Sequence, residues 1–418
     1  MSRTTVVRAC DELVAEGWLS CSPGRGLFVL APSNEVAHRR PVGDLGFALP
    51  EVERARPRRL HAPEGVPYRL VGGLPDLRLL PLQELAAAYR RALRGRGRRL
   101  VSYTDPQGSP RFRRSLGRWL AQTRGLVADP SRLLITRGSQ MALYLLARTL
   151  LGAGDKVAVE GWGYPPAWQA FRQAGASLVG VPVDEQGLVV EAIPDDVRAV
   201  YVTPHHQYPT GVVMSASRRL ALLEFARRRR IPVFEDDYDH EYHYVGSPVL
   251  PLAALDRHGV VVYIGTLSKA FAPGLRLGWV DGAPELIERL TAYRRLVDRQ
   301  GDQVVEHAMA ELLDEGLVQR HIRRTRRVYA ERREVLLERL SRLPVTPHVA
   351  PGGLAIWSAA PGVDVDVWSE RAEAAGVFFN TGAAYSLAAD CGPFVRMGFA
   401  GHSAEELNEA MDRVAAAL

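Results

Sequence analysis

The sequence predicts an α/β fold in which helices cover both faces of a largely parallel sheet, with a smaller α+β part beside it. Two observations support this prediction. From Tyr68 onward, short apolar runs typical of buried strands alternate with longer amphipathic stretches typical of helices. Several of these runs end in polar residues, as expected where the strands of an open sheet present a ligand site. The length of 418 residues allows two or three domains.

The expected elements follow one another along the chain. The predicted strands share an apolar, β-branched composition and cover residues 133–136, 157–159, 199–202, 231–234, 260–264 and 277–280. Helices are expected between them, for example over 139–151 and 166–175. A long helical pattern begins near Glu285 and continues to Leu340, and an α+β segment closes the chain.

The first thirty residues differ from the rest. Apolar residues recur at helical spacing from Val6 to Val14, Gly17 supplies a stop, and two short apolar runs flank the turn at 22–26. We therefore expect one helix and a hairpin over residues 1–30, too small to close a core. Residues 31–66 are rich in Pro, Arg and Glu without sustained periodicity, which indicates a linker to residues 67–418.

Bulk composition sets broad limits. A hydrophobic content of 47% and a charged content of 24% are those of a globular protein. The net charge of +6 fits a nucleic-acid partner, but an arginine-rich genome would give the same balance. Three distant cysteines, Cys10, Cys21 and Cys391, indicate neither disulfides nor a zinc site, so we expect a reducing cytoplasm. Since no apolar run approaches the roughly 18 residues that span a bilayer, no membrane partner is expected.

One lysine stands out. Among 53 lysines and arginines, only Lys156 and Lys269 are lysines. An arginine keeps its proton near neutral pH, whereas a lysine can lose it and become a nucleophile. Lys156 lies in a turn and fits a solvated surface charge. Lys269 follows an apolar run within GTLSKAFAPGLRLG, beside hydroxyl groups and Arg276 that suit a phosphate. This indicates amine chemistry.

Three further loops carry unusual residues. The stretch 136–140, TRGSQ, joins a strand to a helix and could hold an anion, but taken alone a plain helix N-cap is the more common explanation. Asp236 ends an apolar run, where a buried carboxylate needs a positive partner such as a protonated pyridine nitrogen. Arg396 lies in another apolar run and needs an anion such as a substrate carboxylate.

The stretch FEDDYDHEYHY also raises the question of a metal. It contains His240, Glu241 and His243, but no further ligand follows at a recognisable spacing, so no metal site is predicted. A lysine, an acid, a phosphate site and an arginine are instead what pyridoxal 5'-phosphate requires: a Schiff-base amine, a partner for its ring nitrogen, a phosphate cup and a carboxylate ligand.

Longer motifs extend this prediction to a family. The motifs are YTDPQGSPRFRRSL, TRGSQMAL, TPHHQYPTG, EDDYD, YIGTLSKAFAPGLRLG and HIRRTRRVYAERR, with RTTVVRACDELVAEGWL and GRGLFV near the start. From about Tyr68 to the end, the chain resembles class I/II aminotransferases of fold type I. Residues 1–30 resemble the recognition helix and wing of a GntR-type winged helix-turn-helix. The pairing resembles the MocR subgroup of bacterial transcriptional regulators.

The resemblance implies a set of site residues. Lys269 would form the internal aldimine, Asp236 would pair with the pyridine nitrogen, Tyr238 would contact the phenolic oxygen, and Arg396 would bind a carboxylate. Further residues would contact the cofactor ring or phosphate: Gly138, Ser139, Gln140, Tyr164, Thr266, Ser268 and Arg276. Tyr103 would reach the phosphate of a neighbouring subunit, which implies a homodimer. The large cofactor-binding part would span about 106–295, and the small part about 67–105 and 296–418.

The sequence departs from the family at several points. Where most aminotransferases have N-P-x-G, residues 208–211 read YPTG, as in the regulator subgroup, and Pro166 replaces a second carboxylate-binding arginine of some relatives. DNA contacts would come from the first helix and the wing, through Ser2, Arg3, Thr4, Thr5, Arg8 and Arg25. The helices expected before the recognition helix are absent from the sequence, so either translation starts upstream of Met1 or DNA binding has been lost.

Three functions remain open. The leading hypothesis is a regulator of MocR type that senses an amino compound by aldimine exchange at Lys269. The alternative is an aminotransferase that moves an amino group between an amino acid and a 2-oxo acid, with a non-functional DNA-binding remnant. The third is a simple pyridoxal phosphate-binding protein. Whether the chain is an enzyme is left open, as are the effector, the operator and the direction of regulation.

Overall fold

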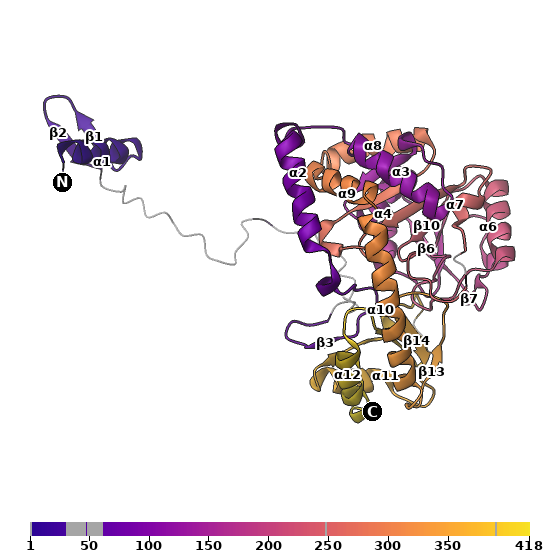
Figure 1. Ribbon diagram of the computed structural model, residues 1–418. Coiled ribbons are helices and arrows are strands. Elements are labelled where there is room, and N and C mark those ends of the chain that lie inside the picture. Colours follow the sequence, from indigo (N-terminus) through magenta and orange to yellow (C-terminus); the bar gives the residue numbers. More distant parts are fainter. Residues whose placement is uncertain (1, 31–46, 48–61, 247–248, 389–390) are drawn as a thin grey trace. The chain divides into compact units, whose positions relative to one another are not determined.

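The protein is described here by a computed structural model, shown in Figure 1, which describes residues 2–30, 47, 62–246, 249–388 and 391–418. The chain forms two compact units, Met1–Pro57 and Arg58–Leu418. Most of the predicted linker, 31–66, lies outside the described residues. The division of the larger unit at 106–295 stays a prediction.

The smaller unit contains the predicted helix and hairpin. Helix α1 (Arg3–Ala15) begins at Ser2, whose hydroxyl accepts a hydrogen bond from the Thr5 amide at 3.2 Å. Strands β1 (Leu19–Ser22) and β2 (Gly26–Val29) pair in antiparallel fashion. No residue of α1 is buried. As expected for so short a fragment, the described residues of this unit enclose no core.

The larger unit is built on a seven-stranded sheet, which its described residues form in the order β4-β12-β11-β10-β9-β5-β6. All pairs are parallel except those of β12, which is antiparallel to β11 and β4. The strands are β4 (Leu133–Thr136), β5 (Lys156–Glu160), β6 (Ser177–Val181), β9 (Ala199–Val202), β10 (Val233–Asp237), β11 (Val261–Thr266) and β12 (Gly278–Asp281). The predicted, largely parallel sheet is confirmed.

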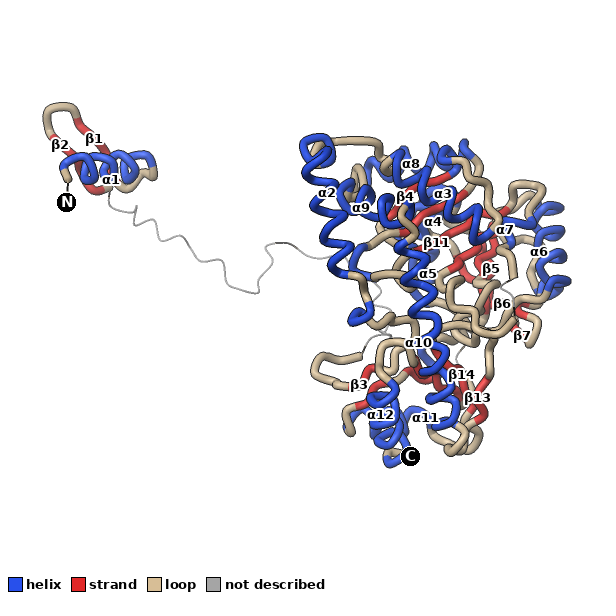
Figure 2. Tube along the Cα trace, viewed as in Figure 1, coloured by secondary structure: helices blue, strands red, loops and turns tan. Residues whose placement is uncertain are grey.

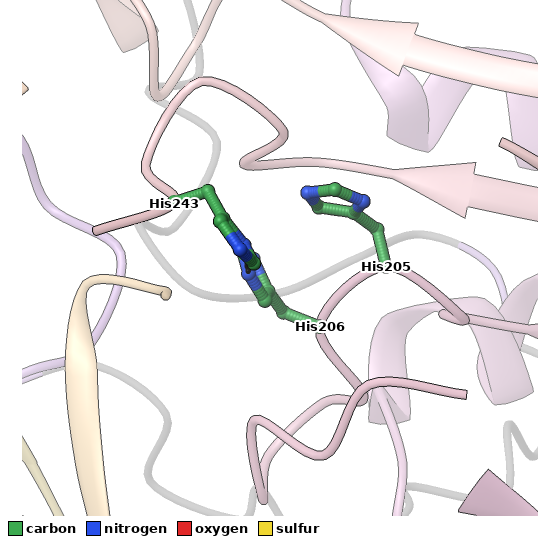
Figure 3. A group of neighbouring side chains, drawn as sticks. All are labelled: His205, His206 and His243. Carbon is green, nitrogen blue, oxygen red and sulfur yellow. Dashed lines mark hydrogen bonds between the residues drawn. The ribbon is translucent and has the colours of Figure 1, made fainter. Parts of the chain in front are cut away.

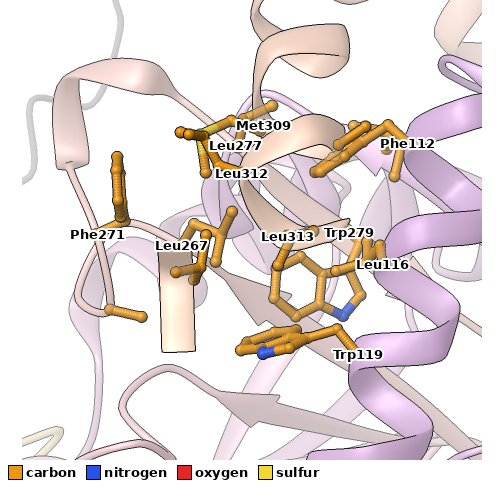
Figure 4. Close-up of a cluster of buried hydrophobic side chains, with 14 of the residues drawn as sticks. Phe112, Leu116, Trp119, Leu267, Phe271, Leu277, Trp279, Met309, Leu312 and Leu313 are labelled. Atoms are coloured by element: carbon orange, nitrogen blue, oxygen red, sulfur yellow. The ribbon is translucent and has the colours of Figure 1, made fainter. Parts of the chain in front are cut away.

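Helices cover both faces of this sheet (Figure 2). Alternate residues of a strand point to opposite faces, so neighbours in one strand belong to different cores. Tyr263 packs with α3 (Pro110–Arg124) and α9 (Gln303–Asp314), whereas Ile264 packs with α4 (Ser139–Leu150), α5 (Pro165–Gln173) and α8 (Pro284–Val297). Figure 4 shows the first of these cores, where Trp119 and Trp279 meet edge to face with ring centroids 6.1 Å apart.

The remaining helices complete the unit: α2 (Leu82–Leu100), α6 (Ala216–Arg229), α7 (Leu252–Leu255), α10 (Leu317–Leu340), α11 (Val365–Ala374) and α12 (Ala404–Ala416). The long helical pattern expected from Glu285 to Leu340 forms three helices, α8, α9 and α10. The helical conformation is interrupted between α8 and α9 near Arg299 and between α9 and α10 at Gly316, where the φ angles are 63° and 69°. Continuous apolar periodicity concealed these breaks because all three helices bury a face.

A second, antiparallel sheet forms a smaller α+β part, into which α10 extends (Figure 1). Its order is β13-β14-β17-β16, with β13 (Thr346–His348), β14 (Ala355–Ala359), β16 (Asn380–Thr381) and β17 (Phe394–Gly398). Two short pairs complete the strands, β3 (Tyr68–Arg69) with β15 (Val377–Phe378) and β7 (Val183–Asp184) with β8 (Gly187–Leu188). Among the described residues, no helix is both long and apolar enough to cross a bilayer.

Candidate cofactor and substrate site

A cavity opens at the carboxyl ends of the parallel strands, as expected for an open α/β sheet. Nine residues expected at the cofactor line it: Ser139, Gln140, Tyr164, Asp236, Tyr238, Thr266, Ser268, Lys269 and Arg276. They come from the ends of β10 and β11, from the start of α4 and from the loops after β5 and β11. Folding therefore brings together residues that are up to 137 positions apart in the chain.

Lys269 lies just after β11 and faces the cavity. Burial, reinforced by the positive charge of Arg396, lowers the pKa of its amine to about 8, and the carboxylates of Asp239 and Asp236 only partly oppose this shift. A substantial fraction of the amine is therefore neutral near pH 7.5. The backbone of Gly73 lies against it, since a Cβ at residue 73 would be 3.3 Å from Nζ.

Asp236 lies near the carboxyl end of β10. Its Oδ2 accepts a hydrogen bond from the Tyr201 hydroxyl at 2.9 Å. Its Oδ1 is buried and, among the described residues, has no hydrogen-bond partner. Burial raises the pKa of this carboxyl to about 7, although the Tyr201 hydrogen bond acts against the shift. A carboxylate oxygen in this state is suited to a positively charged partner in the cavity.

The predicted phosphate cup is assembled around the start of α4. Gly138 caps this helix with a φ angle of 77°, which places free backbone amides at its N-terminus. Arg276 is in the left-handed region, with φ of 51°, and donates to the Arg137 carbonyl at 2.9 Å. A Cβ at residue 138 would lie 2.7 Å from its Nη2, so only glycine allows this approach. The Thr266 hydroxyl donates a hydrogen bond to the Ser268 hydroxyl at 2.9 Å.

Arg396 is buried in β17, and its guanidinium lies 4.6 Å from the ring centroid of Tyr208. Its Nε donates to the Pro209 carbonyl at 3.2 Å, while Nη1 has no hydrogen-bond partner in the described part of the chain. A Cβ at Gly72 would lie only 1.9 Å from Nη1. The guanidinium is therefore held between Tyr208 and the Gly72 backbone, with donors left for an anion.

Four expected residues lie differently. Gly138 and Arg396 do not line the cavity, although Gly138 caps α4 and Arg396 contacts the lining residue Tyr208. Tyr238 lines the cavity, but its hydroxyl donates to the His206 carbonyl at 3.0 Å. Tyr103 does not line the cavity of its own chain; it is 77% exposed and stacks beneath the Arg299 guanidinium at 4.6 Å. Its predicted contact with a neighbouring subunit stays a prediction.

Sequence reasoning missed several lining residues. Gly72 and Gly73 come from the segment before α2, and Tyr201 and Thr203 come from β9 and its end. Tyr201 could have been found, because it belongs to a predicted strand that ends at the expected site. The two glycines carry no side-chain signal, and only the close approach of their backbone to Lys269 and Arg396 identifies them.

Comparison with known proteins identifies the family. The family described as aminotransferase class I and II matches residues 72–414. The chain belongs to this family. Within it, the chain is 34% identical over 349 residues to the probable rhizopine catabolism regulatory protein MocR of Rhizobium meliloti, which covers 81% of this chain and 69% of that protein. It is 30% identical to the HTH-type transcriptional regulator TauR of Rhodobacter capsulatus, over 100% of this chain and 89% of that protein.

A solved structure gives the same fold. The α-aminoadipate aminotransferase LysN of Thermus thermophilus, complexed with N-(5'-phosphopyridoxyl)-L-leucine, matches with a TM-score of 0.78 and 30% identity, over 84% of this chain and 91% of that one. The fold is therefore that of a fold type I aminotransferase, as predicted. This member of the class I and II aminotransferase family is dependent on pyridoxal 5'-phosphate.

The cavity of this family member fits that cofactor. When bound, pyridoxal phosphate supplies an aldehyde that reacts with amines and a ring that withdraws electrons. The unpartnered Oδ1 of Asp236 suits the protonated ring nitrogen, and the amine of Lys269 is available for covalent attachment. Gly138, Ser139 and Arg276 would hold the phosphate. The donors of Arg396 would then face an incoming carboxylate.

Proposed function

We propose that this chain is a pyridoxal phosphate-dependent transcriptional regulator of MocR type. Its cofactor site would bind an amino compound through Lys269, and Arg396 would orient a carboxylate on that compound. The conformational change caused by this binding would be transmitted to the DNA-binding unit through the segment that joins the two units. By linkage, effector and operator would then each alter the affinity for the other.

One observation carries this proposal: the match to the regulator TauR covers 100% of this chain and thus includes the helix-and-hairpin unit. In that unit, Arg3, Arg8 and Arg25 are exposed. Basic side chains on a recognition helix and its wing are the groups that contact phosphates and base edges. The Ser2 hydroxyl is less free to contact DNA than these arginines, because it already caps α1.

DNA selection tests the regulator proposal. The full chain, loaded with pyridoxal phosphate, is immobilised and used to select duplexes from a random library. We expect one sequence family to be enriched, and Arg8→Ala to weaken binding to it and to reduce the salt dependence by about one counterion. Arg257→Ala, an exposed arginine of the other unit, is the matched control. No enrichment, or equal binding by Arg8→Ala, would contradict the proposal.

A second candidate is an aminotransferase, and the Lys269 amine favours it. A pKa of about 8 lets this amine hold and release a proton near neutral pH, as a general acid–base catalyst must. Transamination is tested by mixing the cofactor-loaded chain with single amino acids and following conversion of the cofactor to pyridoxamine phosphate by absorbance. Absence of conversion across a broad panel would count against this candidate while leaving the regulator proposal untouched.

The assembly we propose is a homodimer in the cytoplasm. Support comes from Tyr103, a large aromatic side chain that is exposed in the single chain and lies outside its own cavity. Exposed tyrosines of this kind are enriched at interfaces. A mixed dimer of Lys269→Ala and Tyr103→Ala chains would regain one complete site. If mixing restores no cofactor absorbance above that of the separate variants, the shared site is wrong.

A further inference from the structure

Three buried histidines lie close together near the ends of β9 and β10 (Figure 3). His205 and His206 follow β9, and His243 follows β10. The three are 2%, 1% and 7% exposed, and one ring nitrogen from each lies within 4.8 Å of the others. This is the group of metal-ligating side chains that the described residues bring together. Their separation in the sequence, from 206 to 243, explains why spacing did not reveal them.

His206 is prepared as a ligand. Its Nδ1 lies 2.8 Å from Oδ1 of the buried Asp239, and because an ionised carboxylate only accepts hydrogen bonds, this contact assigns the proton to Nδ1. The other nitrogen, Nε2, therefore presents a lone pair. A carboxylate that fixes the tautomer of an imidazole in this way is the usual outer partner of a metal-bound histidine. The backbone of Gly352 packs against this side of the ring, since a Cβ there would lie 2.2 Å from Nε2.

The spacing between ligand atoms also fits. Nε2 of His206 lies 3.4 Å from Nδ1 of His243, and the two nitrogens share a hydrogen bond that a bound ion would replace. Two nitrogens bound at about 2.1 Å to a tetrahedral ion lie about 3.4 Å apart. The ligand nitrogens of all three rings lie within 4.8 Å of one another, which is wider than this spacing. The ring of His205 would therefore turn slightly toward the other two to bind the same ion.

His205 provides an independent indication. Both of its ring nitrogens are buried, and neither has a hydrogen-bond partner in the described part of the chain. A buried imidazole without partners costs free energy unless another group satisfies it. The neighbouring His240 does not satisfy these nitrogens. Its ring stacks on that of His205 with centroids 4.2 Å apart, and its Nδ1 lies 3.0 Å from a carboxylate oxygen of Asp237.

We propose that His205, His206 and His243 bind a divalent transition-metal ion such as Zn²⁺, with Asp239 as the carboxylate that orients His206. Three imidazoles without a thiolate select borderline ions over Mg²⁺ or Ca²⁺. The fourth coordination position is left for water.

The location gives the ion a consequence for the cofactor site. The loop that starts at His205 continues to Pro209, whose carbonyl accepts from Arg396, and the His206 carbonyl accepts from Tyr238. A metal that fixes this loop would also fix the two groups that face cofactor and substrate. The metal site goes beyond the proposed function, because the ion could be bound whether the chain is a regulator or an enzyme.

Cobalt spectroscopy tests the site. The full chain, loaded with pyridoxal phosphate and freed of metal by a chelator, is titrated with Co²⁺, whose visible ligand-field bands report tetrahedral coordination. We expect saturation at one ion per chain, without the near-ultraviolet bands of thiolate ligands, and displacement by Zn²⁺. His205→Asn and His243→Asn should each weaken binding at least tenfold, whereas the exposed His258→Asn should bind as the unaltered chain does.

Two results would overturn the proposal. One is an unaltered chain that shows no saturable Co²⁺ spectrum or shows thiolate bands; this measurement does not depend on any variant folding. The other is an equal affinity in His205→Asn, His243→Asn and His258→Asn. Thermal unfolding gives a second measurement, because Zn²⁺ should raise the midpoint of the unaltered chain and of His258→Asn but not that of His205→Asn.

Discussion

Asp236→Asn should change how the stability of the cofactor-free chain depends on pH. The carboxyl has an ordinary pKa of 3.8 and a folded-state pKa of about 7, raised by burial. Between these values the folded chain binds a proton that the unfolded chain has lost, so this group makes stability fall as pH rises. Asparagine keeps the shape of the side chain and the acceptor for the Tyr201 hydroxyl, but it carries no charge to bury.

The size of the effect follows from the pKa. Each pH unit between 5 and 7 lowers the free energy of unfolding by about 1.4 kcal/mol through this carboxyl, so the unaltered chain should lose about 3 kcal/mol relative to Asp236→Asn between pH 5 and pH 8. Glu306, with a pKa raised by burial to about 7, is not influenced by Asp236 and cancels in the difference, whereas the pKa of Glu160 is raised mainly by burial and partly by the Asp236 charge and should fall slightly in Asp236→Asn.

Urea unfolding of the cofactor-free chains at pH 5 and pH 8 measures this difference. Asp196→Asn is the control, because Asp196 is exposed and pairs with Lys156 instead of lying at the site. Pyridoxal phosphate should stabilise the unaltered chain more than Asp236→Asn at pH 8, since its ring nitrogen supplies the missing positive partner. If the unaltered chain and Asp236→Asn lose stability in parallel from pH 5 to pH 8, the reasoning about Asp236 is refuted.

Two further changes probe the same cavity. Lys269→Ala should abolish the absorbance of covalently attached cofactor and prevent its trapping by borohydride, whereas Lys156→Ala, the other lysine of the chain, should leave both unchanged; trapping in Lys269→Ala would contradict the assignment. Gly72→Ala would place a methyl group 1.9 Å from Nη1 of Arg396 and displace the guanidinium by about 1 Å. Because a charge-assisted hydrogen bond is then lost, the affinity for carboxylate-bearing amines should fall roughly 10- to 100-fold. The absorbance of the bound cofactor should be unchanged. Gly97→Ala, in open space on α2, is the control, and an equal loss in both variants would point to a general destabilisation.

The fold could be predicted from the sequence largely because buried strands leave a clear pattern. The runs at 133–136 and 199–202 form β4 and β9 with the predicted bounds. Boundaries failed where polar residues continue a strand, as in β10, which extends to Asp237 although two carboxylates end it. The exception inside the sheet, antiparallel β12, has no local signal, since its direction depends on the path of the chain between strands.

Most cavity-lining residues with polar side chains were predictable because their chemistry is unusual for their position, as with a lysine at the end of an apolar run. The same reasoning failed for groups defined only by proximity. His205 and His206 lie beside His243 because β9 and β10 are neighbours in the sheet, which no sequence spacing expresses. Gly72 matters through the absence of a side chain beside Arg396.

Helix α10 belongs to two cores at once. Val318 and Ile322 pack in the core of the large sheet, whereas Tyr329 and Leu336 pack in the core of the smaller part. At about 1.5 Å per residue its 24 residues form a rod of about 36 Å, so one degree of tilt moves its far end by about 0.6 Å.

Between the two buried stretches lies Thr325, whose hydroxyl donates to the carbonyls of His321 and Ile322 at 3.1 and 3.2 Å. Such bonds compete with the helix's own and favour bending. The two parts of the larger unit are therefore connected by a continuous helix that packs in both cores, and not by a flexible hinge alone. A rotation of one part against the other would have to tilt or bend α10, and Thr325 lies at a position that favours bending.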